Sequence, residues 1–226
     1  QPAAFCGVYG LKPTYGLVSR FGLVAFGSSL DQIGPMARSV PDLSAVLNVI
    51  SIPDERDSTC VGRSEQNFLG DLSPDIKGLR IGVPREYVPE DVQDEIGAAC
   101  KETRLKLENA GAQVMDVSLP LTEYAVPAYY VICTAEASSN LSRYDGAHYG
   151  HRSEKDGDLE EMYRSSRSEG FGAEVKRRIM LGTYVLSAGY YDAYYRRALK
   201  ARTKLRREFD AVFEEVDLLL TPTTPS

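Results

Sequence analysis

The pattern that most constrains the fold is an alternation of strand and helix in the middle of the chain. Residues 79–83 (LRIGV) alternate as a β-strand does, and residues 113–119 predict a second strand. Between them, residues 91–109 predict a long helix, and Gly111 is suited to the position just after its C-cap. Two strands joined by a helix pair in parallel. The sequence therefore predicts an α/β fold with a parallel pair of strands.

Three further stretches have helical periodicity. The first begins after Ser39, a typical N-cap residue. Its apolar positions share one face: Leu43, Val46, Leu47 and Ile50. The second covers residues 121–142 despite Pro127, and the third runs from Leu159 almost to Val216. The third is expected to break near residues 170–172 and at Gly189, where glycine interrupts the pattern.

The other stretches predict turns, loops and one more strand. Residues 1–40 contain six glycines among apolar residues, which predicts short strands and tight turns. Residues 51–77 are polar and predict a surface loop, and residues 145–158 predict a second loop. Residues 216–221 (VDLLLT) have the pattern of a buried strand.

Charge and hydropathy exclude some classes of function. The 226 residues include 26 Lys and Arg against 32 Asp and Glu, a net charge of −6, which disfavours broad electrostatic capture of nucleic acid. No apolar run approaches the roughly 20 residues of a membrane helix. One segment is locally basic and is either an RNA- or partner-contacting stripe or a solvated helix face. Its members are Arg196, Arg197, Lys200, Arg202, Lys204, Arg206 and Arg207.

Metal-binding, redox and common nucleotide-binding motifs find little support. His148 and His151 are three residues apart, but their glycine-rich surroundings favour loop histidines over metal ligands. The cysteines form no Cys-x-x-Cys pair, and we expect reduced, buried thiols. They are Cys6, Cys60, Cys100 and Cys133. Neither a Gly-x-Ser-x-Gly elbow nor a phosphate-binding loop motif is present.

Several strings resemble the amidase signature family. Residues 1–16 (QPAAFCGVYGLKPTYG) are similar to the downstream end of its signature, and the resemblance runs to Pro225. Shorter strings that fit are residues 18–22, 29–35 and 54–59. Residues 136–146 (EASSNLSRYDG) and 168–178 (SEGFGAEVKRR) resemble one subfamily, the A subunits of the tRNA-dependent amidotransferase that converts Glu-tRNA(Gln) to Gln-tRNA(Gln).

This resemblance implies an amidase-signature-type mixed sheet covered by helices, in truncated form. The expected organisation is a single partial amidase domain over residues 1–226, with both ends of the parent missing. Enzymes of the family use a Ser–cis-Ser–Lys triad, whose members would all precede Gln1. The chain alone is therefore expected to hold no catalytic residue and to be inactive. Lys12 is a possible substitute base, but its Lys-Pro-Thr context resembles a non-catalytic stretch of the family.

The resemblance also implies two substrate-binding residues. The parent enzymes hold free glutamine, and a planar guanidinium can donate two parallel hydrogen bonds to its α-carboxylate. Arg178 and Tyr129 look like the family's substrate-binding arginine and tyrosine, with Arg177 and Tyr130 as alternatives one residue away. Without the resemblance, such a tyrosine is more often a packing residue and such an arginine a solvated one.

Partners and cofactors follow from the same resemblance. We expect B and C subunits, glutamine, tRNA bound indirectly through the B subunit, no membrane, and a cytoplasmic ligase acting in translation. No metal or cofactor is expected in this chain, whereas ATP and Mg²⁺ would serve the parent complex on its B subunit. Two rival hypotheses stay open. One is a piece of a stand-alone amidase, and the other is a non-catalytic RNA- or partner-binding module on an amidase scaffold.

Overall fold

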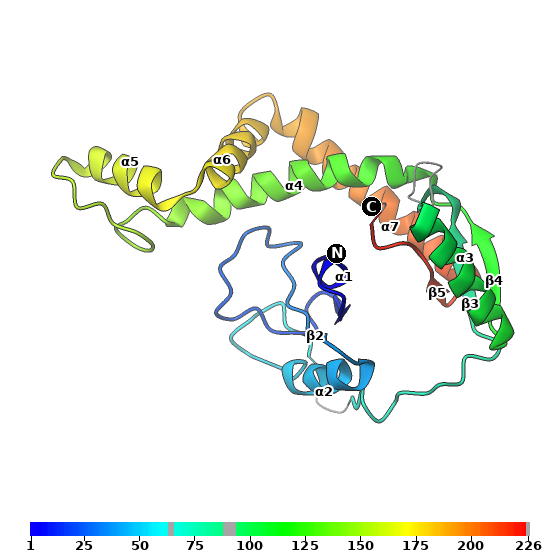
Figure 1. Cartoon of the computed structure of the whole chain (residues 1–226). Coiled ribbons are helices and arrows are strands. Elements are labelled where there is room, and N and C mark those ends of the chain that lie inside the picture. Colours follow the sequence, from blue (N-terminus) through cyan, green and yellow to red (C-terminus); the bar gives the residue numbers. More distant parts are fainter. Residues whose placement is uncertain (63–65, 88–93, 225–226) are drawn as a thin grey trace. The chain divides into compact units, whose positions relative to one another are not determined.

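A computed structural model describes residues 1–62, 66–87 and 94–224 (Figure 1). The chain divides into two compact units. The first comprises Gln1–Phe21, Gln32–Glu123 and Lys204–Ser226, and the second comprises Gly22–Asp31 and Tyr124–Thr203. The single partial domain expected over residues 1–226 stays a prediction.

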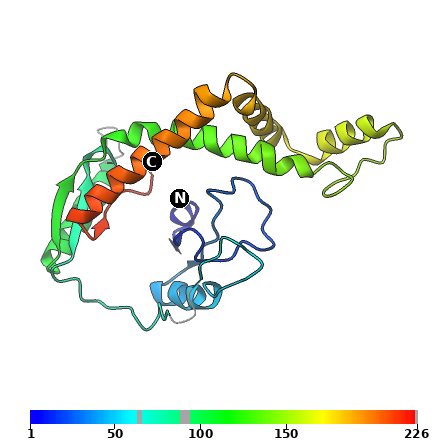
Figure 2. The same ribbon diagram turned by 180° about the vertical axis from the view of Figure 1, so that it is seen from behind.

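The predicted strand–helix–strand unit lies in the first unit. Strand β3 (Arg80–Pro84), helix α3 (Asp94–Asn109) and strand β4 (Gln113–Val117) follow one another, and β3 and β4 pair in parallel. Strand β5 (Leu218–Leu219) pairs in parallel with the other side of β3, giving the order β4-β3-β5. Seen from the front and from behind, α3 covers one face of this sheet and the end of α7 (Arg196–Glu215) the other; Figure 2 shows the second face. The parallel pairing is confirmed.

The end of α3 shows why the predicted boundary is correct. Gly111 has φ of +95°, the left-handed conformation that glycine adopts without steric cost. Its N–H donates to the carbonyl of Glu108 (3.0 Å), and the N–H of Ala112 donates to Leu107 (3.1 Å). These two bonds define a Schellman motif. The part of the predicted helix that precedes Asp94 lies outside the described residues.

One ion pair anchors β5 against β3. Arg80 Nη2 lies 2.6 Å from Asp217 Oδ1, and the backbone N–H of Arg80 donates to Asp217 Oδ2 at 2.9 Å. The expected strand over residues 216–221 is therefore present but short. Val216 is buried as predicted. The prediction of burial is wrong for Leu218, which is 50% exposed. Among the described strands, β5 is an edge strand with a partner on one side, so part of its surface stays open.

The N-terminal stretch contains short elements and turns, as predicted. Strands β1 (Tyr9–Gly10) and β2 (Met36–Ala37) pair antiparallel. The four-residue helix α1 (Pro2–Phe5) was not expected, and it begins with a proline whose missing N–H costs nothing there. Helix α2 (Val40–Ile50) begins after Ser39, whose hydroxyl accepts from the N–H of Asp42.

The apolar face of α2 is narrower than its sequence pattern predicts. Leu43 and Leu47 are buried, but Val46 is 43% exposed. Positions 43 and 47 are separated by four residues and lie above one another on the helix, whereas Val46 lies at the margin of that stripe.

The loop after α2 is held by side chains rather than by regular structure. Asp57 accepts from the backbone N–H of Arg20 (2.8 Å) and from the hydroxyl of Thr59 (2.7 Å). Asp54 accepts from the hydroxyl of Ser19 at 2.8 Å. The N–H of Arg20, followed by the hydroxyl and N–H of Thr59, lowers the pKa of Asp57 to about 2. In the described part of residues 51–77, the predicted loop is confirmed.

The second unit is helical. Helices α4 (Ala125–Asn140), α5 (Leu159–Gly170) and α6 (Ala173–Leu186) precede a π-helical turn at Tyr191–Tyr195, which continues into α7. Pro127 lies in the first turn of α4, where its missing donor breaks no helical hydrogen bond. The predicted interruptions at residues 170–172 and at Gly189 are confirmed. Ala128, Ile132 and Ala198 form the core between α4 and α7. Within the described residues, no helix combines the length and apolar character needed to cross a bilayer.

Helices α4 and α6 pack closely because of one glycine. A β-carbon at Gly182 would overlap the backbone carbonyl of Thr134 and lie 2.7 Å from the β-carbon of Ser138. Beside this contact, the hydroxyls of Ser138 and Thr183 are 2.9 Å apart and share a hydrogen bond. The absence of a side chain at Gly182 therefore sets the separation of the two helices.

Candidate substrate-binding site

The structure brings Tyr129 and Arg178 together. Tyr129 lies in the first turns of α4, Arg178 lies in the first half of α6, and the two helices are in close contact. The Tyr129 hydroxyl and the Arg178 guanidinium lie close enough to interact, since each shifts the pKa of the other. Side chains that the sequence suggested separately thus form one polar pair.

Glu174 forms an ion pair with the Arg178 guanidinium. Its Oε1 accepts from Arg178 Nε at 2.7 Å, one turn along α6. The same carboxylate accepts from Arg177 Nε and Nη2, both at 2.9 Å. Arg177 first, and Arg178 second, lower the pKa of Glu174 to about 2, so it is ionised at neutral pH. Because Nε uses one of five N–H groups, the guanidinium retains donors for an anionic ligand.

Tyr129 is a protonated donor at neutral pH. A hydrogen bond with the buried Cys133 thiol is the largest influence on its pKa, and it raises that pKa above the ordinary value, together with partial burial of the ring. The Arg178 guanidinium acts in the opposite direction with a smaller effect. The ring of Tyr130 packs edge-on against that of Tyr129, with centroids 5.3 Å apart. This contact limits the rotation of the tyrosine.

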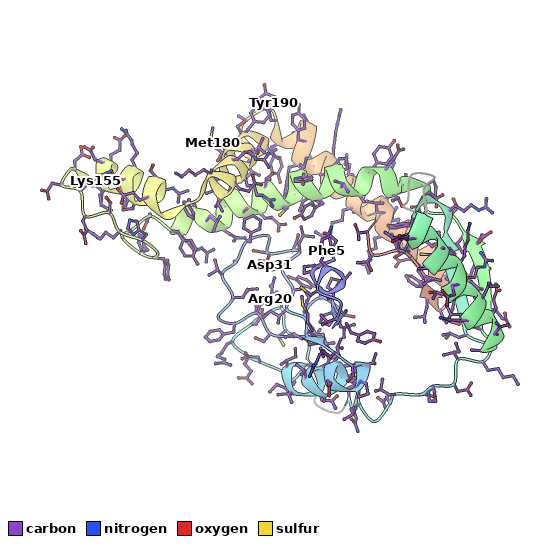
Figure 3. All side chains as sticks on the ribbon, viewed as in Figure 1. Phe5, Arg20, Asp31, Lys155, Met180 and Tyr190 are labelled. Atoms are coloured by element: carbon purple, nitrogen blue, oxygen red, sulfur yellow. The ribbon has the colours of Figure 1, made fainter. Side chains whose placement is uncertain are left out.

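Phe26 adds an aromatic wall that the sequence analysis missed. The Arg178 Cζ lies 5.8 Å from the centroid of the Phe26 ring, within cation–π range. Phe26 belongs to the loop of residues 22–31, whose turn is closed by Asp31. Asp31 Oδ2 accepts from the N–H of Phe26 (2.9 Å) and Oδ1 from that of Gly27 (3.1 Å). Figure 3 labels Asp31 on this loop.

Three side chains from two helices fix the Phe26 loop. Asn140 of α4 donates to the carbonyl of Phe26 (2.9 Å) and to the hydroxyl of Ser28 (2.8 Å). Glu136, one turn earlier, accepts from the N–H of Ser29 at 2.9 Å. Arg202 of α7 donates to the hydroxyl and carbonyl of Ser29 at 2.8 and 3.1 Å. Glu136 and Asn140 are four residues apart on one helix face, a signal within the motif of residues 136–146.

The alternative pair, Tyr130 and Arg177, is more exposed. The Arg177 side chain is 59% exposed and that of Arg178 is 25% exposed. Arg177 is close enough to Tyr130 to interact electrostatically, but its guanidinium donates its hydrogen bonds to Glu174. Arg178 is therefore the more enclosed of the two arginines, and its role as a substrate-binding residue stays a prediction.

Lys12 belongs to the first unit, whereas this pair belongs to the second. Its ammonium donates to the carbonyl of Pro13 at 2.8 Å, and the residue borders a pocket with Gln1 and Gln32. The hydrogen bond to Pro13 occupies one of the three donors of the ammonium, which fits a structural role for Lys12. That Lys12 is not a catalytic base stays a prediction.

The two histidines pair with single carboxylates. His148 Nδ1 lies 2.8 Å from Asp145 Oδ2, and His151 Nε2 lies 2.9 Å from Glu169 Oε2. Across the described parts of the chain, no group of three or more His, Cys, Asp or Glu residues could hold a metal ion. Both histidines lie outside helices and strands, as predicted.

The cysteines are free thiols, but most of them are not buried. Cys133 is buried, Cys60 and Cys100 are half-buried, and Cys6 is exposed. The expectation of burial is therefore wrong for Cys6, which follows the short helix α1 at the surface.

The basic segment of α7 is partly engaged within the chain. Arg196 pairs with Asp192 (2.9 Å), and Arg206 lies 3.7 Å from Asp210. Arg202 binds the Phe26 loop. The remaining four are exposed: Arg197, Lys200, Lys204 and Arg207. These contacts fit a solvated helix face with local partners, and an RNA- or partner-contacting stripe stays a prediction.

Comparison with known families matches the whole chain. The model of the Amidase family covers residues 1–226. The chain belongs to the Amidase family. Among curated amidase-family proteins, the A subunit of glutamyl-tRNA(Gln) amidotransferase from Desulforudis audaxviator is 59% identical over 225 residues. The corresponding protein from Carboxydothermus hydrogenoformans is 58% identical over 226 residues. All of this chain is covered, but only 46% and 47% of those relatives, so it spans about half their length.

Solved amidase-family structures share the fold. The A subunit of glutamyl-tRNA(Gln) amidotransferase from Thermotoga maritima is 42% identical, with a TM-score of 0.75 over 100% of this chain and 44% of that one. A bacterial aryl acylamidase of the amidase signature family matches with a TM-score of 0.74 at 22% identity, over 100% of this chain and 43% of the other. The predicted α/β fold of amidase-signature type is confirmed.

Proposed function

We propose that this amidase-family chain is part of the A subunit of a tRNA-dependent amidotransferase, and that it supplies half of the glutamine-binding site. Two observations support this. Its identity to A subunits from different bacteria is 54–59% over its whole length, and the Tyr129–Arg178 pair has the chemistry that an amino-acid ligand requires. The pairing of those two side chains is the structural observation on which the proposal rests.

In this proposal, Arg178 binds the α-carboxylate of glutamine. The guanidinium is held by Glu174 at Nε and lies near the face of Phe26, so its orientation is fixed before the ligand arrives. A fixed fork loses less conformational entropy on binding a carboxylate than a free side chain does. The Tyr129 hydroxyl, which is neutral at neutral pH, adds a hydrogen bond to the ligand beside the guanidinium.

The chemical step would use residues that are not assigned in this chain. In the proposed parent, a Ser–cis-Ser–Lys triad would hydrolyse glutamine to ammonia through an acyl-enzyme. The B and C subunits would complete a cytoplasmic heterotrimer, with ATP, Mg²⁺ and tRNA handled by the B subunit. The isolated chain is then inactive, because a triad and its oxyanion donors act as a unit. Hydrolysis of glutamine by the pure chain above a buffer blank would refute this.

A stand-alone amidase is the main rival. The shared fold is compatible with this hypothesis, because other amidases of lower sequence identity superpose on this chain with similar TM-scores. The identity to A subunits favours the amidotransferase. Co-purification of the intact protein with B and C subunits would separate the two, since a stand-alone amidase would be isolated without them. Filter binding of tRNA over a salt series tests the hypothesis of an RNA-binding module. That hypothesis requires the affinity for tRNA to fall steeply as the salt concentration rises.

The decisive experiment compares Arg178→Ala with Arg177→Ala in the intact protein assembled with its partners. Loss of a charged hydrogen-bonding group is worth about 1.5–3 kcal/mol, or roughly 10- to 100-fold. Arg178→Ala should raise KM for glutamine by that factor and lower kcat less. Arg177→Ala, an exposed neighbour on the same carboxylate, is the matched control and should change KM little. Unchanged kinetics in Arg178→Ala would remove Arg178 from the site.

A further inference from the structure

A second pocket lies in the first unit, whereas the residues of the proposed glutamine site belong to the second. It has a volume of about 340 Å³ and opens at the carboxyl ends of β3 and β4. In parallel α/β sheets, ligands bind at this edge. Its lining residues are Val83, Pro84, Arg85, Gly97, Cys100, Lys101, Arg104, Asp116, Leu220 and Pro222.

One face of α3 forms a wall of the pocket. Gly97, Cys100, Lys101 and Arg104 follow the spacing i, i+3, i+4 and i+7, which places them in one row along the helix. The apolar lining residues come mainly from the end of β3 and from the residues after β5. A ligand here would meet both charged and apolar groups.

The charged lining residues are mostly basic. They comprise three basic side chains and one acid, Asp116. Arg104 already neutralises that acid, because its Nη1 lies 2.7 Å from Asp116 Oδ1, and its Nε lies 3.1 Å from Glu108. Lys101 and Arg85 remain as the cations that a ligand could use.

Neither of these two cations has an ion pair with an acid among the described residues. Glu86, the neighbour of Arg85 in sequence, is occupied elsewhere. Its carboxylate accepts from the hydroxyl of Ser118 (2.6 Å) and from the N–H of Leu119 (2.8 Å). Arg85 adds an electrostatic attraction to this carboxylate that is smaller than the effect of these two hydrogen bonds, so Glu86 balances the positive charge of Arg85 only in part.

We propose that this pocket binds a small organic anion, with a carboxylate or phosphate head against Lys101 and Arg85 and an apolar body against Val83 and Leu220. The volume is sufficient for a ligand of that class and is at the lower end of the usual range for small-molecule sites. The site differs in chemistry from the Tyr129–Arg178 pair, because its lining includes no tyrosine and its cations come from α3 and from the residue that follows β3.

Cys100 gives the pocket its own reporter. Cys100 is one of the residues that line the pocket, and Cys6 provides an exposed thiol of the same chain for comparison. In the intact protein, alkylation by iodoacetate and by iodoacetamide is followed at both residues by peptide mass spectrometry. The thiolate attacks both reagents and displaces iodide. The rate with iodoacetate divided by the rate with iodoacetamide therefore removes differences in thiol ionisation and reports the local charge. The ratio should be higher at Cys100 than at Cys6.

Comparison of Lys101→Gln with Lys106→Gln distinguishes the effect of a charge at the pocket from the effect of the overall charge of α3. Lys106 lies on the same helix, pairs with Glu102 and is not a lining residue. Lys101→Gln should lower the ratio at Cys100 about threefold, the size of one solvent-screened charge interaction. Lys106→Gln should leave it unchanged. Equal effects of the two variants, or equal ratios at Cys100 and Cys6 in the unsubstituted protein, would overturn the proposal.

A matched pair of ligand probes completes the test. Benzoate and benzamide have similar shapes, but only benzoate is an anion. Benzoate should protect Cys100 from iodoacetamide in a saturable manner and leave Cys6 unprotected, and Lys101→Gln should weaken this protection about threefold. Equal protection by benzamide, or the absence of saturable protection, would overturn the proposal. Neither outcome depends on glutamine hydrolysis, so the result is independent of the proposed function.

Discussion

Gly182 of α6 lies directly against the backbone carbonyl of Thr134 of α4, with no room for a β-carbon between them. This contact sets the distance between the helices that carry Tyr129 and Arg178. Replacing Gly182 by alanine would therefore move the two side chains apart.

Gly182→Ala should destabilise the protein by about 1–3 kcal/mol, the usual cost of overpacking. Met180→Ala is the control, because Met180 lies on the same helix and is 72% exposed (Figure 3). It should change stability by less than about 0.5 kcal/mol. Urea unfolding of both variants measures the difference. Equal stability of Gly182→Ala and the unsubstituted protein would show that the helices can separate without cost.

Asn140→Ala removes both donors that hold Phe26 and Ser28. We expect KM for glutamine to rise several-fold in the intact enzyme, with a smaller change in kcat, because the wall beside Arg178 loses its support. Asn140→Asp should behave similarly, since a carboxylate cannot donate these bonds. Ser142→Ala, two residues beyond, removes an exposed local hydrogen bond and serves as the control. Unchanged KM in both Asn140 variants would exclude a positioning role.

Asp57 predicts a dependence of stability on pH. Its pKa falls from the ordinary 3.8 to about 2 in the folded protein, through the N–H of Arg20 first and then Thr59. The lowered value means that the folded state favours the carboxylate. The resulting stabilisation is complete above pH 3.8 and is lost as the pH falls through about 2.

Asp57→Asn should lower the melting temperature at neutral pH, and its difference from the unsubstituted protein should shrink as the pH approaches 2. Thermal unfolding over a pH series measures this difference. Asp71→Asn, at an exposed carboxylate, is the control and should shift the melting temperature little. A difference that stays constant across the series would assign the effect of Asp57 to geometry rather than to charge.

Gly111→Ala tests the end of α3. A left-handed φ of +95° is strained for alanine, so the variant should lose about 1 kcal/mol of stability. Gly111→Asn should lose less, because asparagine tolerates this conformation better. Equal losses would point to contact with Lys77, whose Cγ would lie 3.2 Å from an added β-carbon, in place of backbone strain.

The sequence predicts local structure here better than it predicts contacts. The strands beside α3 and the glycine at residue 111 follow from alternation and cap chemistry, both of which are local. Tyr129 and Arg178 came from resemblance to a family, and the structure brings them together. The position of Phe26 beside Arg178 could not be predicted from the sequence. The partner that holds Phe26, Asn140, is 114 residues away, and no periodicity links residues at such a separation. Gly182 within a helix was not singled out, because its role depends on the neighbouring helix.

The anchoring of the Phe26 loop has a consequence for the order of folding. Its links to Glu136 and Arg202 span 107 and 173 residues, whereas a helix such as α4 forms through contacts four residues apart. Long-range closure carries an entropic cost that local contacts do not. We expect the aromatic wall to assemble last, so that a nascent chain acquires its helices well before it can recognise a ligand.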